Sequence, residues 1–419
     1  MRFSRQIKTV EQALQDLLAR LQKLDEEQVQ LGEAYGRILA RDVIATCDMP
    51  PFDRSPLDGF AVRAADTVHA SVDQPVYLRV QETVAAGQVP RIPVEAGCAT
   101  RIMTGAMMPE GADAVIMFEQ TENPGIYSEV VGIKRALLSG ENFSRRGEEI
   151  AQGTVVARAG ERINAGTIAV LATFGYSQVG VIRKPRVGLL STGIELVAVD
   201  EPLAPGKIRN SNTSMLSALI AEAGGIPVLF PVLPDEPAEA KQKLTAYVRE
   251  VDLLISSGGV SVGDYDVIAS LADDPEVTLL FNRIAMRPGS PTTGLLLSGR
   301  PVLALSGNPG ACFVGYELFA RPALRCLAGR EQAGLHPIKA QLGTSYEKPC
   351  PYPRYLRGRL LLKDGVLIAQ PDFNDKAGNL GTLKNSECLI VIPAGGRGKQ
   401  AGELVDVIVH AQPSWRGEV

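Results

Sequence analysis

Apolar residues recur along this chain with two different spacings, which separate helical segments from β-strands. Near the start, Thr9 and Gln12 form the pattern of a capping box, and apolar residues follow at helical spacing. This pattern predicts an amphipathic helix with an apolar face of Val10, Ala13, Leu14, Leu17, Leu18 and Leu21. A second short helix is expected over residues 31–39, and a third from its cap Asn164 to about Phe174.

The centre of the chain, from Pro185 to about Arg325, alternates short apolar runs with helical patterns. The runs predict strands at residues 187–190, 228–232, 253–255, 277–281 and 302–305. The helical patterns predict helices at residues 236–249 and 312–327, and another that begins at Asn212 or Thr213 as its cap. Such alternation predicts a parallel sheet with helices on both faces.

Two other segments carry a β pattern. Residues 50–145 contain short alternating runs between many glycines and prolines, which predicts a small β-rich domain. Near the end of the chain, an Asp364-Gly365 turn joins two apolar runs in a predicted hairpin. Further strands are expected at residues 390–392 and 405–409, so this part should form a small β-barrel or a curled sheet.

Two glycine-rich loops directly follow predicted strands of the central sheet. The first begins with Ser256-Ser257-Gly258-Gly259, and the second is Ser306-Gly307-Asn308-Pro309-Gly310. Backbone without Cβ atoms lets the phosphates of a ligand approach N–H groups closely. Because ligands of such sheets bind beyond the carboxyl ends of the strands, the two loops predict a phosphorylated ligand.

Carboxylates beside these loops suggest a divalent cation. Asp264 and Asp266 follow the first loop, and either could instead cap the next helix. Both interpretations stay open for Asp264, whereas metal-plus-phosphate chemistry favours a functional role for Asp266. Ser191-Thr192-Gly193-Ile194-Glu195 follows the first strand of the same sheet, where it could complete the pocket or form a turn with a solvent-facing Glu195.

A further loop carries basic side chains. Arg283 and Arg287 lie four residues apart, with Ser290 close behind, and such donors suit an oxyanion or a phosphate. A surface ion pair is equally compatible with the spacing. The three histidines lie near no acidic or cysteine motif and no Gly-x-Ser-x-Gly elbow occurs, so positioning and electrostatics are favoured over covalent catalysis.

Composition narrows the class of protein. The 419 residues suffice for more than one domain, because single cores rarely grow beyond roughly 250–300 residues. The net charge of −4 does not favour a nucleic-acid partner, and no apolar run approaches the ~20 residues of a membrane span. The six cysteines form no CxxC pair, which is typical of free thiols in a reducing cytosol. We therefore expect a cytoplasmic protein without a nucleic-acid or membrane partner.

Ordered motifs along most of the chain identify a family. The first is Pro50-Pro51-Phe52-Asp53-Arg54-Ser55-Pro56-Leu57-Asp58-Gly59-Phe60-Ala61. Others follow in order: Met103-Thr104-Gly105-Ala106, Gly140-Glu141-Asn142, Arg146-Gly147-Glu148, Ser191-Thr192-Gly193, the loop of residues 258–266, Arg287-Pro288-Gly289 and Gly307-Asn308-Pro309. From about residue 5 to 410, the chain resembles the molybdopterin molybdenumtransferases of the MoeA type, which are related to the E domain of gephyrin.

The resemblance implies a homodimer whose chains have four domains. Residues 1–48 and 145–182 would form a discontinuous linking domain, 49–144 the β-rich domain, 183–329 the parallel α/β domain that binds molybdopterin, and 330–412 the C-terminal β-barrel. It also implies that the protein takes adenylylated molybdopterin and molybdate, releases AMP in a Mg²⁺-dependent step and leaves molybdenum on the dithiolene sulfurs. Molybdopterin adenylyltransferase and apo-molybdoenzymes are the implied partners.

The resemblance carries roles to individual residues. The implied catalytic residues are Asp58, Thr104, Glu195 and Asp266, of which Asp58 and Thr104 would reach into the site of the partner subunit. The implied metal ligands are Glu195, Asp264 and Asp266. The implied cofactor-binding residues are Ser191, Thr192, Gly193, Ser257, Gly258, Gly259, Ser261, Gly263, Asp264, Gly307, Asn308, Pro309, Arg283, Arg287, Ser290 and Arg357.

The sequence departs from the family pattern at several of these places. Ile194 replaces an acidic residue, Ser290 replaces a common lysine, and Arg283 and Arg287 stand where the family carries lysines near the molybdate. Ser306 and Gly310-Ala311 replace a proline and a Val-Ser pair, and residues 376–379 match poorly where a serine is expected.

Two other functions are considered besides metal insertion: adenylylation of molybdopterin, which a related α/β domain performs, and a scaffold role like that of gephyrin.

Overall fold

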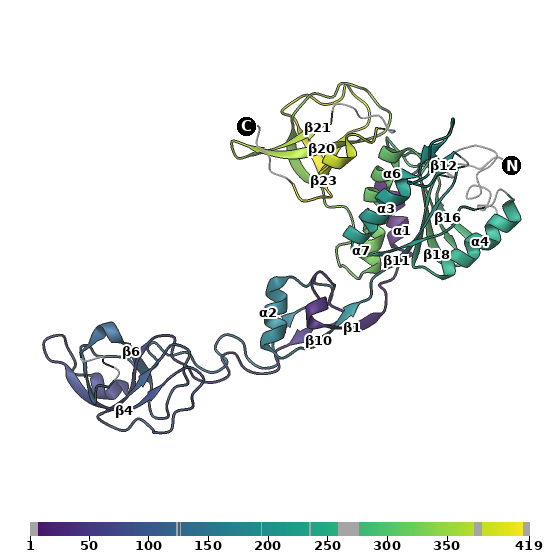
Figure 1. The fold of residues 1–419 in the computed structure, drawn as a ribbon. Helices are drawn as coiled ribbons and strands as arrows, with labels where there is room; N and C mark the ends of the chain where they lie inside the picture. Colours follow the sequence, from purple (N-terminus) through teal and green to yellow (C-terminus); the bar gives the residue numbers. More distant parts are fainter. Residues whose placement is uncertain are drawn as a thin grey trace. The chain divides into compact units, whose positions relative to one another are not determined.

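The computed structural model describes residues 7–122, 125, 127–193, 195–233, 236–258, 276–372 and 379–413 (Figure 1). The chain forms two compact units. Unit 1 consists of Met1–Ala40, Gly160–Asn164 and Val179–Val419, and unit 2 consists of Arg41–Ala159 and Ala165–Gln178. No described helix is long and apolar enough to cross a membrane.

A six-stranded sheet forms the centre of unit 1. Its strand order is β14 (Ile226–Leu229), β11 (Arg186–Ser191), β15 (Leu253–Ser257), β18 (Arg300–Leu305), β17 (Thr293–Leu297) and β16 (Val277–Phe281). The first four strands are parallel, as the alternating pattern predicts, but β17 and β16 are antiparallel to their neighbours. A two-residue turn at Ser298 and Gly299, both with positive φ, joins β17 to β18, and such a tight turn imposes the antiparallel direction.

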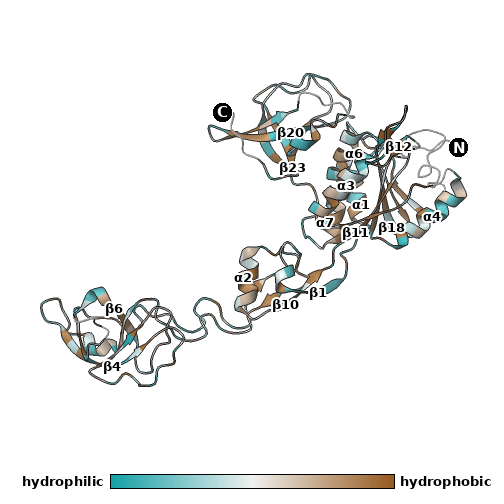
Figure 2. Cartoon of the chain, in the orientation of Figure 1, coloured by the Kyte–Doolittle hydropathy of each residue, from teal (hydrophilic) through white to brown (hydrophobic). Residues whose placement is uncertain are grey.

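Helices cover both faces of this sheet. Side chains of the central strands alternate between two cores: Leu253 and Ile255 lie in one, and Leu254 in the other. The first core also contains the buried faces of α1 (Val10–Leu18), α3 (Ser211–Glu222), α6 (Pro309–Gly315) and α7 (Arg321–Leu327). The second contains the buried face of α4 (Pro237–Arg249). Figure 2 shows β11 and β18 mainly in brown, as expected for strands buried on both faces.

Several predicted helices differ in their details. α1 begins with the predicted capping box of Thr9 and Gln12. α3 is capped by Asn210 and not by Asn212 or Thr213, because the Asn210 side chain accepts the Thr213 N–H. The predicted helix over residues 312–327 begins earlier, at Pro309, and contains a π-helical turn, η5 (Tyr316–Ala320), between α6 and α7.

The predicted second helix, over residues 31–39, is wrong. Only a 3-10 turn, η1 (Leu31–Glu33), forms there. Gly36 takes a φ of +79°, which ends helical geometry, and Ile38 and Leu39 then form β-bridges. Nearby, β1 (Glu26–Gln30) pairs with β10 (Gln178–Ile182).

The C-terminal part of unit 1 is a closed five-stranded barrel, which confirms the predicted fold. Its strands follow the order β19 (Ile338–Leu342), β21 (Val366–Pro371), β20 (Arg354–Lys363), β22 (Cys388–Ile392) and β23 (Leu404–Val409). Asp364 and Gly365, with φ of 50° and 78°, form the predicted turn between β20 and β21. The strand β19 has no counterpart among the predicted elements.

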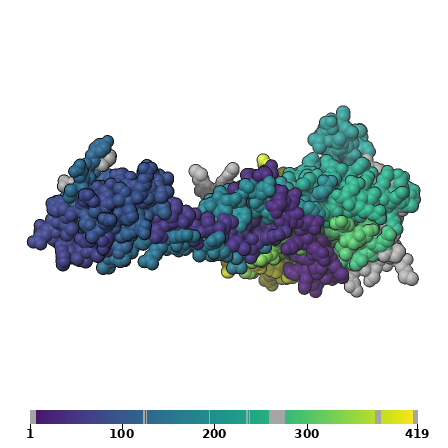
Figure 3. All heavy atoms as spheres, turned by 90° about the horizontal axis from the view of Figure 1, so that it is seen from below, coloured from purple at the N-terminus to yellow at the C-terminus, as the bar shows by residue number. Residues whose placement is uncertain are grey.

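Unit 2 is rich in β-strands, as predicted, and its atoms can be followed in blue in Figure 3. A six-stranded sheet has the order β6 (Ala114–Met117), β3 (Gly59–Val62), β5 (Cys98–Ile102), β4 (Val76–Val84), β8 (Val130–Ile133) and β7 (Thr121–Glu122). β2 (Val43–Ile44) pairs with β9 (Val155–Ala157). α2 (Ala165–Thr173) confirms the helix predicted after Asn164.

Candidate functional site

The three central strands of the sheet in unit 1 end at the same level. β11, β15 and β18 are adjacent and parallel, and Ser191 pairs in register with Ser257, which pairs in register with Leu305. The loops that follow these strands therefore begin side by side. The loops after β15 and β18 are the two that the sequence predicts to bind a phosphorylated ligand, and the loop after β11 is the one that could complete their pocket.

The two glycine-rich loops touch each other. The Gly258 N–H donates to the Leu305 carbonyl oxygen at 2.9 Å. A Cβ atom on Gly307 would lie 3.8 Å from the Cα of Gly258. Gly258 itself has a φ of +92°, and a Cβ there would lie 2.7 Å from Thr192 Oγ1. The close approach of the loop after β15 to Thr192, in the loop after β11, thus depends on the missing side chain at position 258.

Glu195 lies at the same edge. A Cβ atom on Gly193 would lie 2.5 and 2.6 Å from the two carboxylate oxygens of Glu195, so this carboxylate folds back against the loop after β11. The side chain is exposed to solvent. An exposed carboxylate at a strand end can serve as a ligand for a hard cation.

The first turn of α3 ties the three strand ends together. Asn210 Nδ2 donates to Ser191 Oγ at 3.0 Å, and Thr213 Oγ1 lies 2.7 Å from the same oxygen. Asn212 Nδ2 donates to Ser257 Oγ and to the Gly307 carbonyl oxygen, both at 2.8 Å. The sequence suggests Asn212 and Thr213 only as caps, although two asparagines in one first turn exceed what a single cap requires.

A buried thiol completes this edge. Cys312 of α6 lies within hydrogen-bonding reach of Ser257 and is fully buried. Burial raises the pKa of Cys312 to about 12, although the hydrogen bond with Ser257 acts in the opposite direction. The group is therefore a neutral thiol and not a nucleophile at neutral pH.

Five predicted site residues lie outside the described residues: Gly259, Ser261, Gly263, Asp264 and Asp266. Ile194 and residues 376–378, where the sequence departs from the family pattern, lie outside them as well. Among the described residues, no group of three His, Cys, Asp or Glu side chains could hold a metal ion. Of the predicted metal ligands only Glu195 is described, and its oxygen donors at a strand end are of the type that Mg²⁺ prefers.

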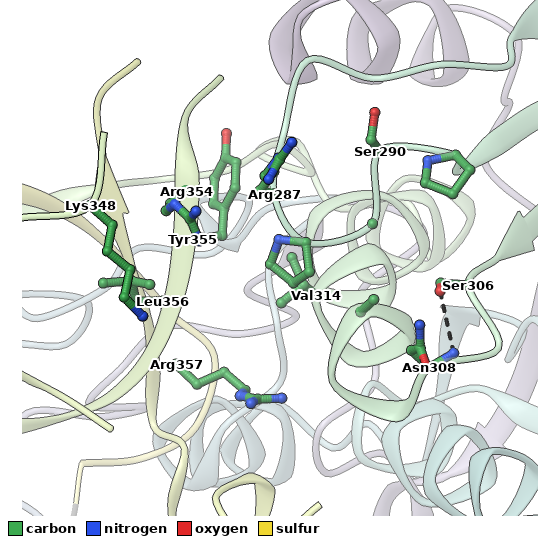
Figure 4. Close-up of a pocket in the computed structure, with 14 residues that line it drawn as sticks. Arg287, Ser290, Ser306, Asn308, Val314, Lys348, Arg354, Tyr355, Leu356 and Arg357 are labelled. Carbon is green, nitrogen blue, oxygen red and sulfur yellow. Dashed lines mark hydrogen bonds between the residues drawn. The ribbon is translucent and has the colours of Figure 1, made fainter. Parts of the chain in front are cut away.

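A cavity of about 490 Å³ lies between the α/β domain and the barrel of unit 1 (Figure 4). Arg287, Lys348, Arg354 and Arg357 bring four cationic side chains to its wall, and no carboxylate is among the described residues that line it. Pockets on the order of 300–1,000 Å³ are typical of small-molecule sites. This cavity therefore suits a small anionic ligand.

Loop and barrel residues meet along this cavity. The Arg287 N–H donates to the Pro353 carbonyl oxygen at 3.0 Å, and the Tyr355 N–H donates to the Arg287 carbonyl oxygen at 2.9 Å. Figure 4 shows Arg357 extending from β20 toward the side on which Ser306 and Asn308 lie. The backbone pairing fixes the basic loop against the strand that carries the barrel cations.

Two of the predicted binding residues, Ser290 and Arg283, do not point a free polar group into this cavity in the way the prediction implies. Ser290 lines the cavity, but its hydroxyl donates to the Ile284 carbonyl oxygen at 2.7 Å. Arg283 is not among the described residues that line the cavity. Lys348 and Arg354 were not predicted, and both lie over the Tyr346 ring, at 5.6 and 5.5 Å from its centroid. Their only sequence signal is a basic residue on either side of a proline-rich stretch.

Unit 2 holds the remaining predicted pair. Thr104 donates to Asp58 Oδ1 twice, from its N–H at 2.6 Å and from its hydroxyl at 2.8 Å. These hydrogen bonds, the backbone one first, lower the pKa of Asp58, and the charge of Arg101 acts in the same direction. Asp58 and Thr104 therefore form one hydrogen-bonded pair that carries a negative charge.

The fold and the site define a multidomain protein whose α/β domain has loops suited to a phosphorylated ligand and a neighbouring cavity suited to an anion. A molybdopterin molybdenumtransferase of Staphylococcus epidermidis is 40% identical over 413 residues, which cover 98% of this chain and 97% of that protein. One from Bacillus subtilis is 41% identical over 388 residues, 92% of this chain and 90% of that protein. The chain belongs to the molybdopterin molybdenumtransferase family, a family of transferases.

Family models and a solved structure agree with this assignment. The model described as "MoeA N-terminal region (domain I and II)" matches residues 8–175, "Probable molybdopterin binding domain" matches 188–326, and "MoeA C-terminal region (domain IV)" matches 339–410. The crystal structure of the molybdopterin biosynthesis moeA protein from Pyrococcus horikoshii OT3 has a TM-score of 0.83 and 31% sequence identity, covering 97% of this chain and 100% of that one. The resemblance inferred from sequence motifs is thereby confirmed.

Proposed function

We propose that this protein inserts molybdenum in molybdenum cofactor biosynthesis, by transferring it from molybdate to the dithiolene of adenylylated molybdopterin with release of AMP. The observation that carries the proposal is the contact between the Gly258 and Gly307 loops at the edge where the three strands end. The curated relatives named molybdopterin molybdenumtransferase support the choice of substrates.

Release of AMP requires cleavage of a pyrophosphate bond, during which negative charge increases on the phosphates. Backbone N–H groups of the glycine-rich loops can stabilise that charge because the absence of side chains allows close approach. Glu195, together with Asp264 and Asp266, would hold Mg²⁺. The bound cation would neutralise phosphate charge.

Molybdate is a dianion, and the cationic cavity of unit 1 suits it. Arg287 was predicted to lie near the molybdate and Arg357 to be a basic binding residue of the last domain, and Lys348 and Arg354 add two further positive charges to the same wall. Guanidinium groups hold tetrahedral oxyanions through paired N–H donors. An anion in this cavity would lie on the barrel side of the α/β domain.

We also propose that the protein works as a cytoplasmic homodimer in which Asp58 and Thr104 of one subunit complete the site of the other. The family resemblance supports this arrangement, as does the pairing of these two residues in a charged group at the surface of unit 2. Molybdopterin adenylyltransferase would supply the adenylylated substrate, and apo-molybdoenzymes would accept the product.

Incubation of the purified protein with adenylylated molybdopterin, molybdate and Mg²⁺ tests the proposal. We expect AMP release that requires both molybdate and Mg²⁺. Consumption of ATP on free molybdopterin would instead indicate adenylylation. Absence of both reactions would leave a scaffold role and contradict the proposal.

A further inference from the structure

Asn212 is the most deeply buried polar side chain of the α3 turn at the site. Only 7% of its surface is exposed. Its amide nitrogen bonds the last residue of β15, Ser257, and the loop after β18, at Gly307. A single side-chain group thus connects the end of β15 with the loop after β18, whose backbones are also joined by the hydrogen bond from the Gly258 N–H to the Leu305 carbonyl oxygen.

The orientation of the Asn212 amide follows from its partners. The Gly307 carbonyl oxygen can only accept, so the atom that faces it must be the nitrogen. Both hydrogens of that nitrogen are used, and the other amide atom, Oδ1, is buried without a hydrogen-bond partner among the described residues. A buried amide oxygen without a partner costs free energy, which a leucine of the same branched shape would not.

Formation of the helix does not explain Asn212 either. Asn210 already caps α3 by accepting the Thr213 N–H. The strand β11 is held by Asn210 and Thr213, through Ser191. The part of the turn that Asn212 adds is the link between the loops after β15 and β18.

We propose that Asn212 is a positioning residue, which holds the end of β15 and the Gly307 loop in register so that this edge of the sheet can bind the phosphates of one ligand. This inference rests on the proposed function, because it takes that ligand to be the pyrophosphate-bearing pterin. Since the loops contact phosphates in both the ground state and the transition state, loosening them weakens binding more than it slows the chemical step.

Replacement of Asn212 by leucine tests this role. For Asn212→Leu we expect the KM for adenylylated molybdopterin to rise about tenfold, with kcat changed much less and the melting temperature within a few degrees of that of the wild type. Tyr316→Phe is the matched control. The Tyr316 hydroxyl donates at 2.7 Å to the carbonyl oxygen of Leu219, which lies on α3, the helix that carries Asn212, but away from the site. That variant should lose stability and keep its KM.

The outcomes separate this inference from the proposed function. An unchanged KM in a folded, active Asn212→Leu variant overturns the inference and leaves the function standing. A wild-type protein that releases no AMP overturns the function itself. If Asn212→Leu does not fold, Asn212→Asp provides the same test, because aspartate keeps the shape of the asparagine side chain and lacks both N–H donors of its amide. Equal KM values for Asn212→Asp and the wild type would again overturn the inference.

Discussion

At the scale of single residues, hydrogen bonds keep the candidate carboxylate of unit 2 ionised. Two donors from Thr104 lower the pKa of Asp58. Because the folded pKa lies below the ordinary value of about 3.9, the contribution of this group to stability is complete above roughly pH 4 and is lost as the pH falls through the folded value. The charge of Asp58 is therefore constant over the neutral range.

We predict that Asp58→Ala and Glu195→Ala each lose AMP release while their melting temperatures stay close to that of the wild type. Both side chains are exposed, so the substitutions remove little packing. Each substitution does remove a carboxylate that is proposed to act on the substrate. Wild-type AMP release should show no fall attributable to Asp58 between about pH 5 and pH 8.

Asp66→Ala is a suitable control for these variants, because its carboxylate also accepts a backbone N–H in unit 2, that of Gly97 at 3.0 Å. It should retain AMP release. Melting that collapses in both Asp58→Ala and Glu195→Ala would show that these residues serve the fold instead of the reaction.

At the scale of elements, the helical segment from α6 to α7 contains a buried ion pair. Arg321 donates to both carboxylate oxygens of Glu317, from Nε at 2.6 Å and from Nη2 at 2.9 Å, and both residues are buried. Glu317 lies in the π-helical turn η5. Burial raises the pKa of Glu317, so the pair depends on Arg321 to remain charged.

We predict that Glu317→Ala lowers the free energy of unfolding by about 3–5 kcal/mol, because it leaves the Arg321 charge buried without its main partner. The double variant Glu317→Met/Arg321→Met should recover most of this loss, since it removes both charges and keeps the volume. Denaturant unfolding of Glu317→Met, Arg321→Met and the double variant measures the coupling. Additive losses would show that the pair is not coupled.

Elements with strong local signals could be predicted from the sequence, and those set by tertiary pairing could not. The capping box of α1 and the Asp364-Gly365 turn are local features, and both were found as predicted. The strand β17 was missed, although Ser298 and Gly299 between Thr293–Leu297 and β18 are turn-forming residues. Their antiparallel pairing depends on the turn between them.

At the scale of the whole molecule, the proposed catalytic residues lie in different compact units. Asp58 belongs to unit 2 and Glu195 to unit 1. The proposed homodimer would bring Asp58 of one subunit to the Glu195 of the other. A site shared between two subunits predicts that two different inactive chains can restore activity in a mixed dimer, whereas a site formed within one chain does not.

We predict that Asp58→Ala and Glu195→Ala chains, each inactive alone, recover about one quarter of wild-type AMP release when co-expressed. Random pairing of the two chains makes about half of the dimers mixed, and each mixed dimer has one intact site out of two. Purification with two different tags isolates the mixed dimers. If these are inactive, Asp58 acts within its own chain.

The part of the site that lies in sequence motifs could be predicted from the sequence. Ser191 and Ser257 end strands, Gly258 and Gly307 lie in the loops beyond strand ends, and all four lie at one edge of the sheet, as their places after apolar runs predict. Lys348 and Arg354 come from the barrel and reach the cavity only through folding. The role of Asn212 likewise depends on contacts with residues 45 and 95 positions away.

The burial of Cys312 has a consequence for handling a thiophilic metal. In its ionised form, a thiol beside Ser257 would be a soft ligand competing with the dithiolene for molybdenum, and it could trap the metal on the protein. Desolvation inside the first core keeps the proton on this sulfur, so Cys312 does not act as such a ligand.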